Sequence, residues 1–301
     1  MTVANITQEK NKFLQETANN IRESIIEMLL EAKSGHTAGP LGMADIFTAL
    51  FFHTLRHDPK NPKKTDRDIF VLSNGHICPV YYATLAHAGY FPTDELKTLR
   101  KFGSRLQGHP HREFLPILET SSGPLGCGLS QAVGMAIADR IDNGKSSSRQ
   151  IYCFLGDGEL DEGNNWEAFM LGAKEKLQNL TVVIDRNNIQ IDGFTEDIMP
   201  LNNLDKKMEA FNWHTQVIDG HDFNQIIGAF GEAQAVFDRP SVIIANTIPG
   251  KGVDFMERRF EWHGTPPDVS NISGAPEKGE QGKKALEELR TLGGKIRSEH
   301  E

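Results

Sequence analysis

Short runs of consecutive apolar residues alternate along the chain with segments whose apolar residues recur at helical spacing. Buried strands are expected at the runs, because parallel strands covered on both faces are apolar throughout. The strands expected at such runs are 68–72, 151–155, 180–184 and 241–246, and the βαβ alternation adds one at 213–219. The expected helices are 8–33, 44–55, 92–100, 131–140, 166–173, 203–211 and 223–237. This alternation predicts an α/β fold with a doubly wound, mainly parallel sheet and helices on both faces.

The length of 301 residues fits one large α/β domain, which we place at residues 1–269. Residues 270–301 are rich in Gly, Glu and Lys, and they predict a tail with one helix at 284–292. The first seventeen residues lack the charged-then-apolar pattern of a signal peptide. No apolar run approaches the ~18 residues of a membrane span. We therefore expect no membrane association.

The net charge is −9, from 41 acidic and 32 basic residues, with no basic block. This balance argues against a nucleic-acid partner or an anionic membrane surface. An anionic ligand would have to be held locally, by a metal, by histidines or by helix amino-termini. The cysteines Cys78, Cys127 and Cys153 have no metal-binding spacing, and their odd number favours a reducing, cytoplasmic compartment.

The clearest candidate chemistry lies after two expected strands. Gly156-Asp157-Gly158 follows the run 151–155, and Asn187 follows the run 180–184. Ligands of open α/β sheets bind at the carboxyl ends of the strands, so the two side chains should meet there. A carboxylate, an amide oxygen and a backbone carbonyl suit Mg²⁺, which prefers six oxygens and often keeps phosphate and water. The pattern predicts a site for a metal-bound diphosphate.

Glycine precedes histidine in three turns, at His36, His76 and His109. Taken alone, each would be an ordinary solvated loop histidine. His76, however, follows an expected strand and precedes a helix, where a phosphate would meet backbone donors and an imidazole. The most glycine-rich segment, 121–130, is not a dinucleotide-binding fingerprint, because Gln131 stands where the third glycine is required.

In this order, the motifs resemble those of thiamine diphosphate enzymes, in particular the amino-terminal half of transketolase, over about residues 21–264. The resemblance implies thiamine diphosphate as cofactor and Mg²⁺ as metal, with Ca²⁺ or Mn²⁺ as alternatives. It implies that Asp157, Asn187 and the carbonyl of Ile189 hold the metal. Gly158 belongs to the same cofactor motif.

The resemblance also assigns the remaining site residues. His36 and His109 would contact the sugar substrate, and His76 the diphosphate. His263, in Glu261-Trp262-His263-Gly264, would close over both the diphosphate and the substrate. In the glycine-rich segment, the backbone at Gly123 and Leu125 would receive the aminopyrimidine.

Two residues depart from the family pattern, and the role of three others has to be considered separately. Thr37 stands where Pro is usual, and Cys127 stands where Gln is usual. Glu162 and Glu167 are either solvated helix acids or part of a subunit contact. His221 is expected to be a turn histidine whose hydrogen bonds are satisfied.

The resemblance implies the amino-terminal subunit of a split transketolase, which transfers a two-carbon ketol unit from a ketose phosphate to an aldose phosphate. The chain ends at Glu301, soon after His263. We therefore expect a partner subunit to supply the pyrimidine-binding domain and the catalytic glutamate, in an α2β2 assembly. The alternatives are a subunit of a 2-oxo acid dehydrogenase and a non-catalytic regulatory subunit. The histidines argue against the first, and the intact metal pair argues against the second.

Overall fold

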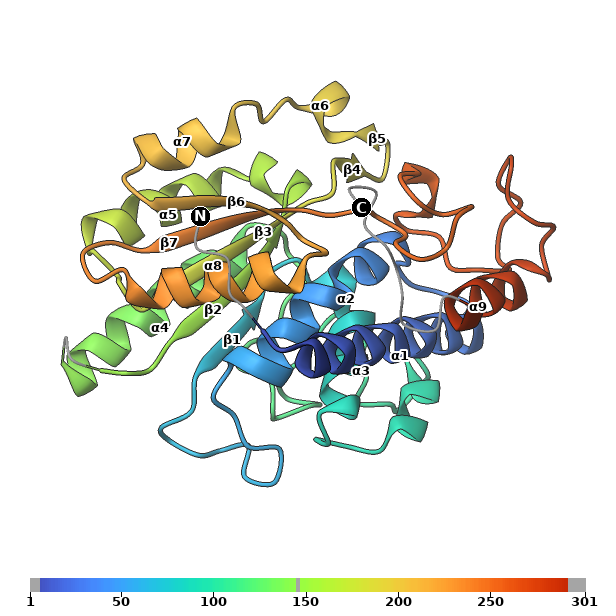
Figure 1. Ribbon diagram of the computed structural model, residues 1–301, viewed down its shortest axis with the longest axis horizontal. Coiled ribbons are helices and arrows are strands. Elements are labelled where there is room, and N and C mark those ends of the chain that lie inside the picture. The colour runs from blue at the N-terminus through green and yellow to red at the C-terminus, as the bar shows by residue number, and fades with distance from the viewer. Residues whose placement is uncertain (1–5, 145–146, 292–301) are drawn as a thin grey trace.

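A parallel sheet forms the centre of the protein in the computed structural model, which describes residues 6–144 and 147–291 (Figure 1). Within these residues the sheet has five strands in the order β1-β2-β3-β7-β6, and every pairing is parallel. The strands are β1 (Ile69–Leu72), β2 (Ile151–Gly156), β3 (Leu180–Arg186), β6 (His214–Asp219) and β7 (Ser241–Asn246). Each lies within two residues of its predicted bounds.

Helices cover both faces of the sheet, which confirms the predicted fold class. Alternate side chains of a strand point to opposite faces. Phe70 and Phe154 pack with one group of helices, and Val71 and Cys153 pack with the other. The first group is α1 (Gln8–Ala32), α2 (Ala38–Ala49), α3 (Cys78–His87) and α8 (Phe223–Ala235), and the second is α4 (Cys127–Asn143), α5 (Gly163–Lys174) and α7 (Leu204–Ala210).

Short elements connect the main strands and helices. A hairpin of β4 (Ile189–Gln190) and β5 (Gly193–Phe194) follows β3. The others are a π-helical turn at Leu50–Thr54, 3₁₀ turns at Gly75–Ile77, Thr93–Thr98, Gly158–Asp161 and Phe260–Trp262, and helix α6 (Thr195–Ile198). The segment predicted as a helix at 92–100 is therefore a 3₁₀ turn.

Two predicted helix starts are wrong by four residues or more. Helix α2 begins at Ala38 rather than at 44, because Pro40 lies in the first turn, where a backbone N–H has no intrahelical partner to lose. Helix α4 begins at Cys127 rather than at 131, directly after Gly126 at φ 84°. Helix α1 ends at Ala32, one residue before its predicted end, and Lys33 takes the left-handed cap at φ 51°, with its N–H donating to the carbonyl of Leu29 over 2.9 Å.

The segment predicted as a tail forms helix α9 (Gln281–Thr291), which lies on α1 (Figure 1). Ala285 and Leu289 are fully buried, and Nδ2 of Asn19 donates to the carbonyl of Leu289 over 3.1 Å. The chain up to Thr291 thus packs with the domain, so the predicted boundary at 269 is wrong there. Leu292, the last residue of the predicted helix, lies outside the described residues. Among those residues, no helix is long and apolar enough to cross a membrane.

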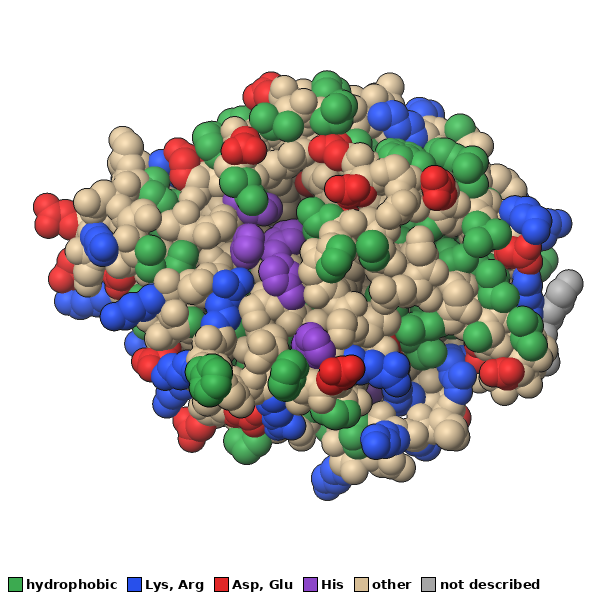
Figure 2. All heavy atoms as spheres, turned by 180° about the vertical axis from the view of Figure 1, so that it is seen from behind, with side chains coloured by type: hydrophobic (Ala, Val, Ile, Leu, Met, Phe, Trp, Pro, Cys, Tyr) green, Lys and Arg blue, Asp and Glu red, His purple; other side chains and the backbone are tan. Residues whose placement is uncertain are grey.

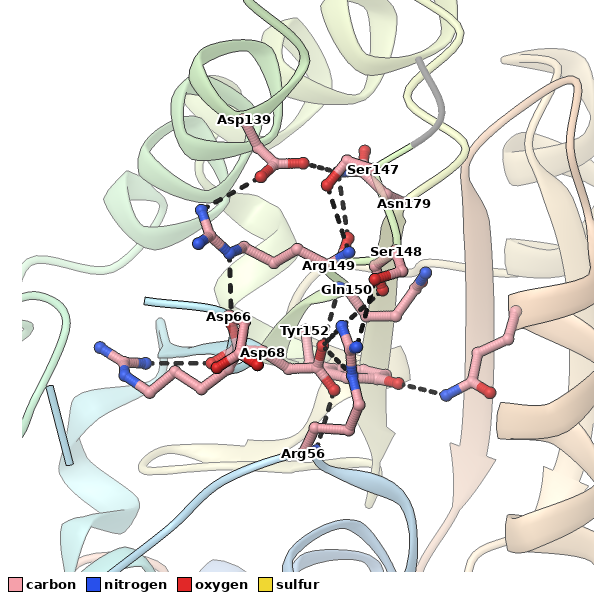
Figure 3. A network of polar contacts seen from close by, with 12 residues as sticks. Arg56, Asp66, Asp68, Asp139, Ser147, Ser148, Arg149, Gln150, Tyr152 and Asn179 are labelled. Carbon is pink, nitrogen blue, oxygen red and sulfur yellow. Dashed lines mark hydrogen bonds and ion pairs between the residues drawn. The ribbon is translucent and has the colours of Figure 1, made fainter. Parts of the chain in front are cut away.

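A polar network joins the loops at the amino ends of the strands (Figure 3). Arg56 donates from Nη2 to Asp68 over 2.8 Å, just before β1. Asp139, on α4, accepts from Nη1 of Arg149 over 3.1 Å and from Nδ2 of Asn179 over 3.2 Å, just before β2 and β3. These bonds tie the loops before β1, β2 and β3 together, at the end of the sheet opposite the carboxyl ends of its strands.

Candidate functional site

A cavity of about 340 Å³ opens at the carboxyl ends of the strands. Every residue predicted for the metal, the cofactor or the substrate lines it. Those from the ends of β2 and β3 are Asp157, Gly158, Asn187 and Ile189; the others are His36, His76, His109, His263, Gly123 and Leu125. The sequence therefore predicted the place of the site, while the role of each residue remains a prediction.

Three histidines form a cluster in this cavity, and Figure 2 shows histidine side chains gathered in a hollow of this face. The ring centroids of His36 and His76 lie 4.8 Å apart, those of His76 and His263 5.2 Å, and those of His36 and His263 5.5 Å. His36 precedes α2, His76 lies in the turn after β1, and His263 follows the last 3₁₀ turn. Residues far apart in the chain thus meet at one point.

The histidines of this cluster are neutral at pH 7. Burial is the main cause, and it lowers the pKa of His263 to about 4. Burial, followed by the neighbouring His263, lowers the pKa of His36 to about 3. The pKa of His76 is also lowered well below its usual value, first by burial and then by His263 and His36. A neutral imidazole has both a donor and an acceptor nitrogen, which suits hydroxyl and phosphate ligands.

Two of these rings have unused hydrogen-bonding capacity. The Nδ1 atoms of His36 and His263 are buried and have no hydrogen-bond partner among the described residues. Buried polar atoms are ordinarily paired, so two unpaired nitrogens on rings that line the cavity leave hydrogen-bonding capacity beside it. Gly123 also lines the cavity: its φ is 150°, and a Cβ there would lie 3.7 Å from the ring of His109. A side chain at this position would reduce the space for a ligand.

Backbone amides hold the carboxylate of Asp157 in the cavity wall. Its Oδ1 accepts from the N–H of Gly158 over 2.7 Å, and its Oδ2 accepts from the N–H of Asn188 over 2.7 Å and from Nη1 of Arg186 over 2.9 Å. Burial raises the pKa of Asp157, and the Arg186 guanidinium opposes that rise. Among the residues that the structure describes, Oδ1 has a single hydrogen bond, so it keeps a lone pair for a ligand.

Asn187 is oriented by its neighbours in the same loop. Its Nδ2 donates to Oδ2 of the buried Asp185 over 2.8 Å, and its Oδ1 accepts from the N–H of Ile189 over 3.0 Å. Carboxylate, amide and carbonyl oxygens are hard ligands, so this donor set fits Mg²⁺ completed by diphosphate oxygens. The described residues contain no group of three His, Cys, Asp or Glu placed for a metal, and the predicted donor set has only one such residue.

Two residues that the sequence analysis did not single out hold the loops of the site in place. Glu159 is buried and lines the cavity; it accepts from Oγ of Ser73 over 2.5 Å and from the N–H of Gly126 over 2.9 Å. Burial raises its pKa. It ties the glycine-rich loop to the end of β1. An acid directly after the Gly-Asp-Gly turn was the available signal, but its partners are more than thirty residues away.

The second of these residues is Arg100, which carries no motif. Its Nη1 donates to Oγ of Ser34 over 2.9 Å, and its Nη2 donates to the carbonyl of Gly108 over 3.3 Å. Ser34 lies in the loop of His36, and Gly108 lies in the loop of His109. Arg100 therefore fixes the relative position of these two loops, which carry two of the predicted substrate-binding histidines. His109 itself is exposed at the rim of the cavity, and its pKa is lowered by partial burial and by Arg100.

The remaining predictions have separate outcomes. Thr37 compensates for the missing Pro through a hydrogen bond from its Oγ1 to the carbonyl of Thr265 over 2.8 Å. His221 is satisfied as predicted, since its Nδ1 lies 2.7 Å from Asp45 and its Nε2 accepts from the N–H of Ile248 over 2.8 Å. Cys127 is partly exposed at the first position of α4. Glu162 and Glu167 are exposed, and both interpretations of them stay open.

The comparisons with known proteins agree with this geometry. A family model described as "Transketolase, thiamine diphosphate binding domain" matches residues 14–283. An apulose-4-phosphate transketolase subunit of Actinobacillus succinogenes is 41% identical over 280 residues, which cover 92% of this chain and 96% of that protein. The 6-deoxy-6-sulfo-D-fructose transketolase subunit SqwG of a Clostridium species is 41% identical over 250 residues, or 83% of this chain and 90% of that protein.

Solved structures give the same result. Transketolase from Leishmania mexicana superposes with a TM-score of 0.80 at 32% identity. The match covers 94% of this chain and 45% of the Leishmania chain, so this chain spans less than half of that transketolase. The chain belongs to the transketolase family, and the sheet with its cavity is the thiamine diphosphate binding domain of that family.

Proposed function

We propose that this chain is the cofactor-binding subunit of a two-subunit transketolase, which moves a two-carbon ketol unit from a ketose phosphate to an aldose phosphate. The observation that carries the proposal is one cavity that joins the Asp157–Asn187 loop to a cluster of neutral histidines. The apulose-4-phosphate and SqwG relatives match along nearly their whole length. Both are transketolase subunits, which favours this function over a 2-oxo acid dehydrogenase component or a regulatory subunit.

In this proposal the chain binds and orients, and thiamine diphosphate supplies the carbanion-stabilising chemistry when bound. Asp157, Asn187 and the carbonyl of Ile189 hold a divalent metal, with Mg²⁺ as the first choice and Ca²⁺ or Mn²⁺ as alternatives. His76 and His263 contact the diphosphate. The backbone at Gly123 and Leu125, with Gly158 in the same wall, completes the cofactor site.

His36, His109 and His263 would then act on the substrate. Their neutral rings can donate to and accept from sugar hydroxyls, and a neutral imidazole can also accept a proton at its free nitrogen. Arg100 holds the loops of His36 and His109 together, so the spacing between these two groups depends on it. The relatives are named for different sugars, so assays with several ketose phosphates would define the sugar specificity of this chain.

The proposal includes a partner subunit that supplies the pyrimidine-binding domain and the catalytic glutamate. Its support is the naming of the relatives as subunits and an open cavity whose rim carries the exposed apolar side chain of Ile191, 66% accessible. An α2β2 assembly is proposed, because closed symmetric assemblies predominate among oligomers. Glu162 and Glu167 would lie at a subunit contact. The three free cysteines support a reducing, cytoplasmic location.

A coupled assay tests the two-subunit proposal. The purified chain, given thiamine diphosphate, Mg²⁺ and a donor and acceptor sugar phosphate, should transfer no ketol unit until a partner subunit is added. An open diphosphate site leaves water at the reacting centre, which a second domain would exclude. Full turnover by the chain alone would overturn this proposal.

Cofactor titration tests the metal assignment separately. Asp157→Ala and Asn187→Ala should abolish Mg²⁺-dependent thiamine diphosphate binding, because each removes an oxygen ligand. The wild-type chain should gain about 2.7 kcal/mol of stability at a hundredfold excess of cofactor over its dissociation constant. Equal calorimetric affinities for wild type and Asp157→Ala would contradict the assignment.

The histidine roles separate in the assembled enzyme. His36→Ala and His109→Ala should lower turnover and leave cofactor affinity nearly unchanged, whereas His76→Ala should weaken cofactor binding. A His109→Ala enzyme that loses cofactor but keeps its turnover at saturation would contradict these roles.

A further inference from the structure

Arg186 forms an ion pair with the predicted metal ligand from outside the cavity. It is the last residue of β3, its side chain is 12% exposed, and its Nη1 lies 2.9 Å from Oδ2 of Asp157, whose side chain is 1% exposed. Its Nη2 pairs with Glu196 on helix α6. Asp157, Asp185 and Asn187 line the cavity, whereas Arg186 does not. A positive charge thus lies directly behind the carboxylate that faces the cavity.

The contribution of Arg186 to Asp157 is charge rather than position. Two backbone amides already fix the carboxylate, one on each oxygen, over 2.7 Å in both cases. A divalent ion on Asp157 would share this carboxylate with a guanidinium, and two cations a few ångströms apart repel each other. Buried charges are screened little by salt, so this repulsion persists in solution.

Glu196 anchors the guanidinium and offsets part of its charge. It also accepts from the N–H of Leu201 over 3.2 Å, which fixes it on the segment after the β4–β5 hairpin. Asp157, Arg186 and Glu196 form a chain of two ion pairs, and the formal charges of these three groups sum to −1. A diphosphate would add negative charge on the cavity side, where it offsets both the metal and Arg186.

We propose that Arg186 is the internal counter-ion of Asp157, and that it makes the site accept a divalent metal together with a diphosphate but disfavour the bare ion. The proposal rests on the metal role of Asp157 in the proposed function. Arg186 would act on metal affinity through its charge, without touching the metal, and Glu196, which offsets that charge, would have the opposite effect on affinity. Metal and cofactor would each bind more tightly when the other is present. The diphosphate would offset the charge of Arg186 that repels the metal, and the metal would offset the negative charge of the carboxylate that repels the diphosphate.

The test measures binding of Mn²⁺ alone to the full chain, with free Mn²⁺ followed by electron paramagnetic resonance. Arg186→Gln keeps a hydrogen-bond donor and removes the charge, so it should tighten Mn²⁺ binding roughly tenfold. Glu196→Gln leaves the charge of Arg186 unshared, so it should weaken binding. A merely structural role would weaken binding in both variants, and that result would overturn the proposal.

Diphosphate should reduce the difference in metal affinity between wild type and Arg186→Gln. With thiamine diphosphate present, calorimetry should give similar Mg²⁺ affinities for wild type and Arg186→Gln. This difference in affinity should be smaller than the difference in Mn²⁺ affinity measured without thiamine diphosphate. An equal or larger difference would overturn the coupling. Arg239→Gln makes the same substitution at the exposed pair with Asp238, remote from the cavity, and it should leave Mn²⁺ affinity unchanged.

A double variant separates this inference from the proposed function. Arg186→Gln combined with Asp157→Asn should lose the tightened Mn²⁺ binding. If the double variant binds Mn²⁺ as well as Arg186→Gln does, the metal role of Asp157 fails, and the inference fails with it. If Asp157 is required but neither single variant shifts affinity, only the inference is overturned. Thermal unfolding verifies that each variant is folded. If Arg186→Gln does not fold, Glu196→Gln alone tests the inference, because it should weaken Mn²⁺ binding.

Discussion

Acidification should destabilise this domain through the partly buried histidines of the cavity. In the folded chain, the pKa of His36 is about 3 and that of His263 about 4, because burial penalises the charged rings. An unfolded histidine has a pKa of about 6.5. Folding thus lowers both pKa values, and the unfolded chain binds more protons over this pH range. The stability contributed by these residues is therefore present above about pH 6.5 and is lost as the pH falls below it.

The pKa values set the size of the loss. At pH 5 an unfolded histidine lies about 1.5 pH units below its pKa, which corresponds to about 2 kcal/mol at about 1.36 kcal/mol per unit. Both folded pKa values are at or below about 4, so neither ring compensates by binding a proton at pH 5. Protonation of His36 and His263 in the unfolded chain should together lower the free energy of unfolding by about 4 kcal/mol between pH 8 and pH 5. The contribution of His263 levels off near pH 4, and that of His36 near pH 3.

Urea unfolding at pH 8 and pH 5 measures this loss. Wild type, His36→Gln, His263→Gln and the double variant should be compared, so that groups common to all four cancel. Each single substitution should remove about 2 kcal/mol of the pH dependence, and the double variant about 4 kcal/mol. If the double variant lost as much stability as wild type on acidification, the two histidines would not have the lowered pKa values on which this prediction rests.

Three further predictions concern stability and can be tested by urea unfolding at pH 8. Asp45→Asn should cost about 3–5 kcal/mol, because it leaves the buried guanidinium of Arg22 without its bidentate partner, and a loss below about 1 kcal/mol would contradict this. Leu289→Ala should cost about 2–5 kcal/mol if α9 belongs to the packed domain, whereas a true tail would give no change. Thr37→Val should cost about 1–3 kcal/mol, because the carbonyl of Thr265 loses its donor, and Thr37→Ser should restore most of it.

The strands and the place of the site were predictable from the sequence, because a separate physical rule applies to each of them. A strand buried on both faces is apolar throughout, so Ile151–Leu155 and Ser241–Ala245 stand out from helical patterns. Parallel strands present their carboxyl ends at one edge, so residues that follow β2 and β3 had to meet. Asp157 and Asn187 consequently line one cavity.

The missed features depend on partners that are distant in sequence. Glu159 appears as one acid in an acidic segment until Ser73 and Gly126 are placed beside it. Arg186 has no recognisable role before its two carboxylate partners are known. Helix α9 has few apolar residues, and its packing becomes evident only when α1 supplies the facing surface.

The contact between α1 and α9 also bears on how the chain is made. The two helices pack together although about 250 residues separate them along the chain, from Gln8–Ala32 to Gln281–Thr291. During synthesis, which proceeds from the amino end at about 5–20 residues per second, α1 leaves the ribosome many seconds before α9 exists. The part of α1 that α9 covers must therefore remain exposed on the growing chain, where chaperones that bind apolar segments can reach it until the last helix arrives.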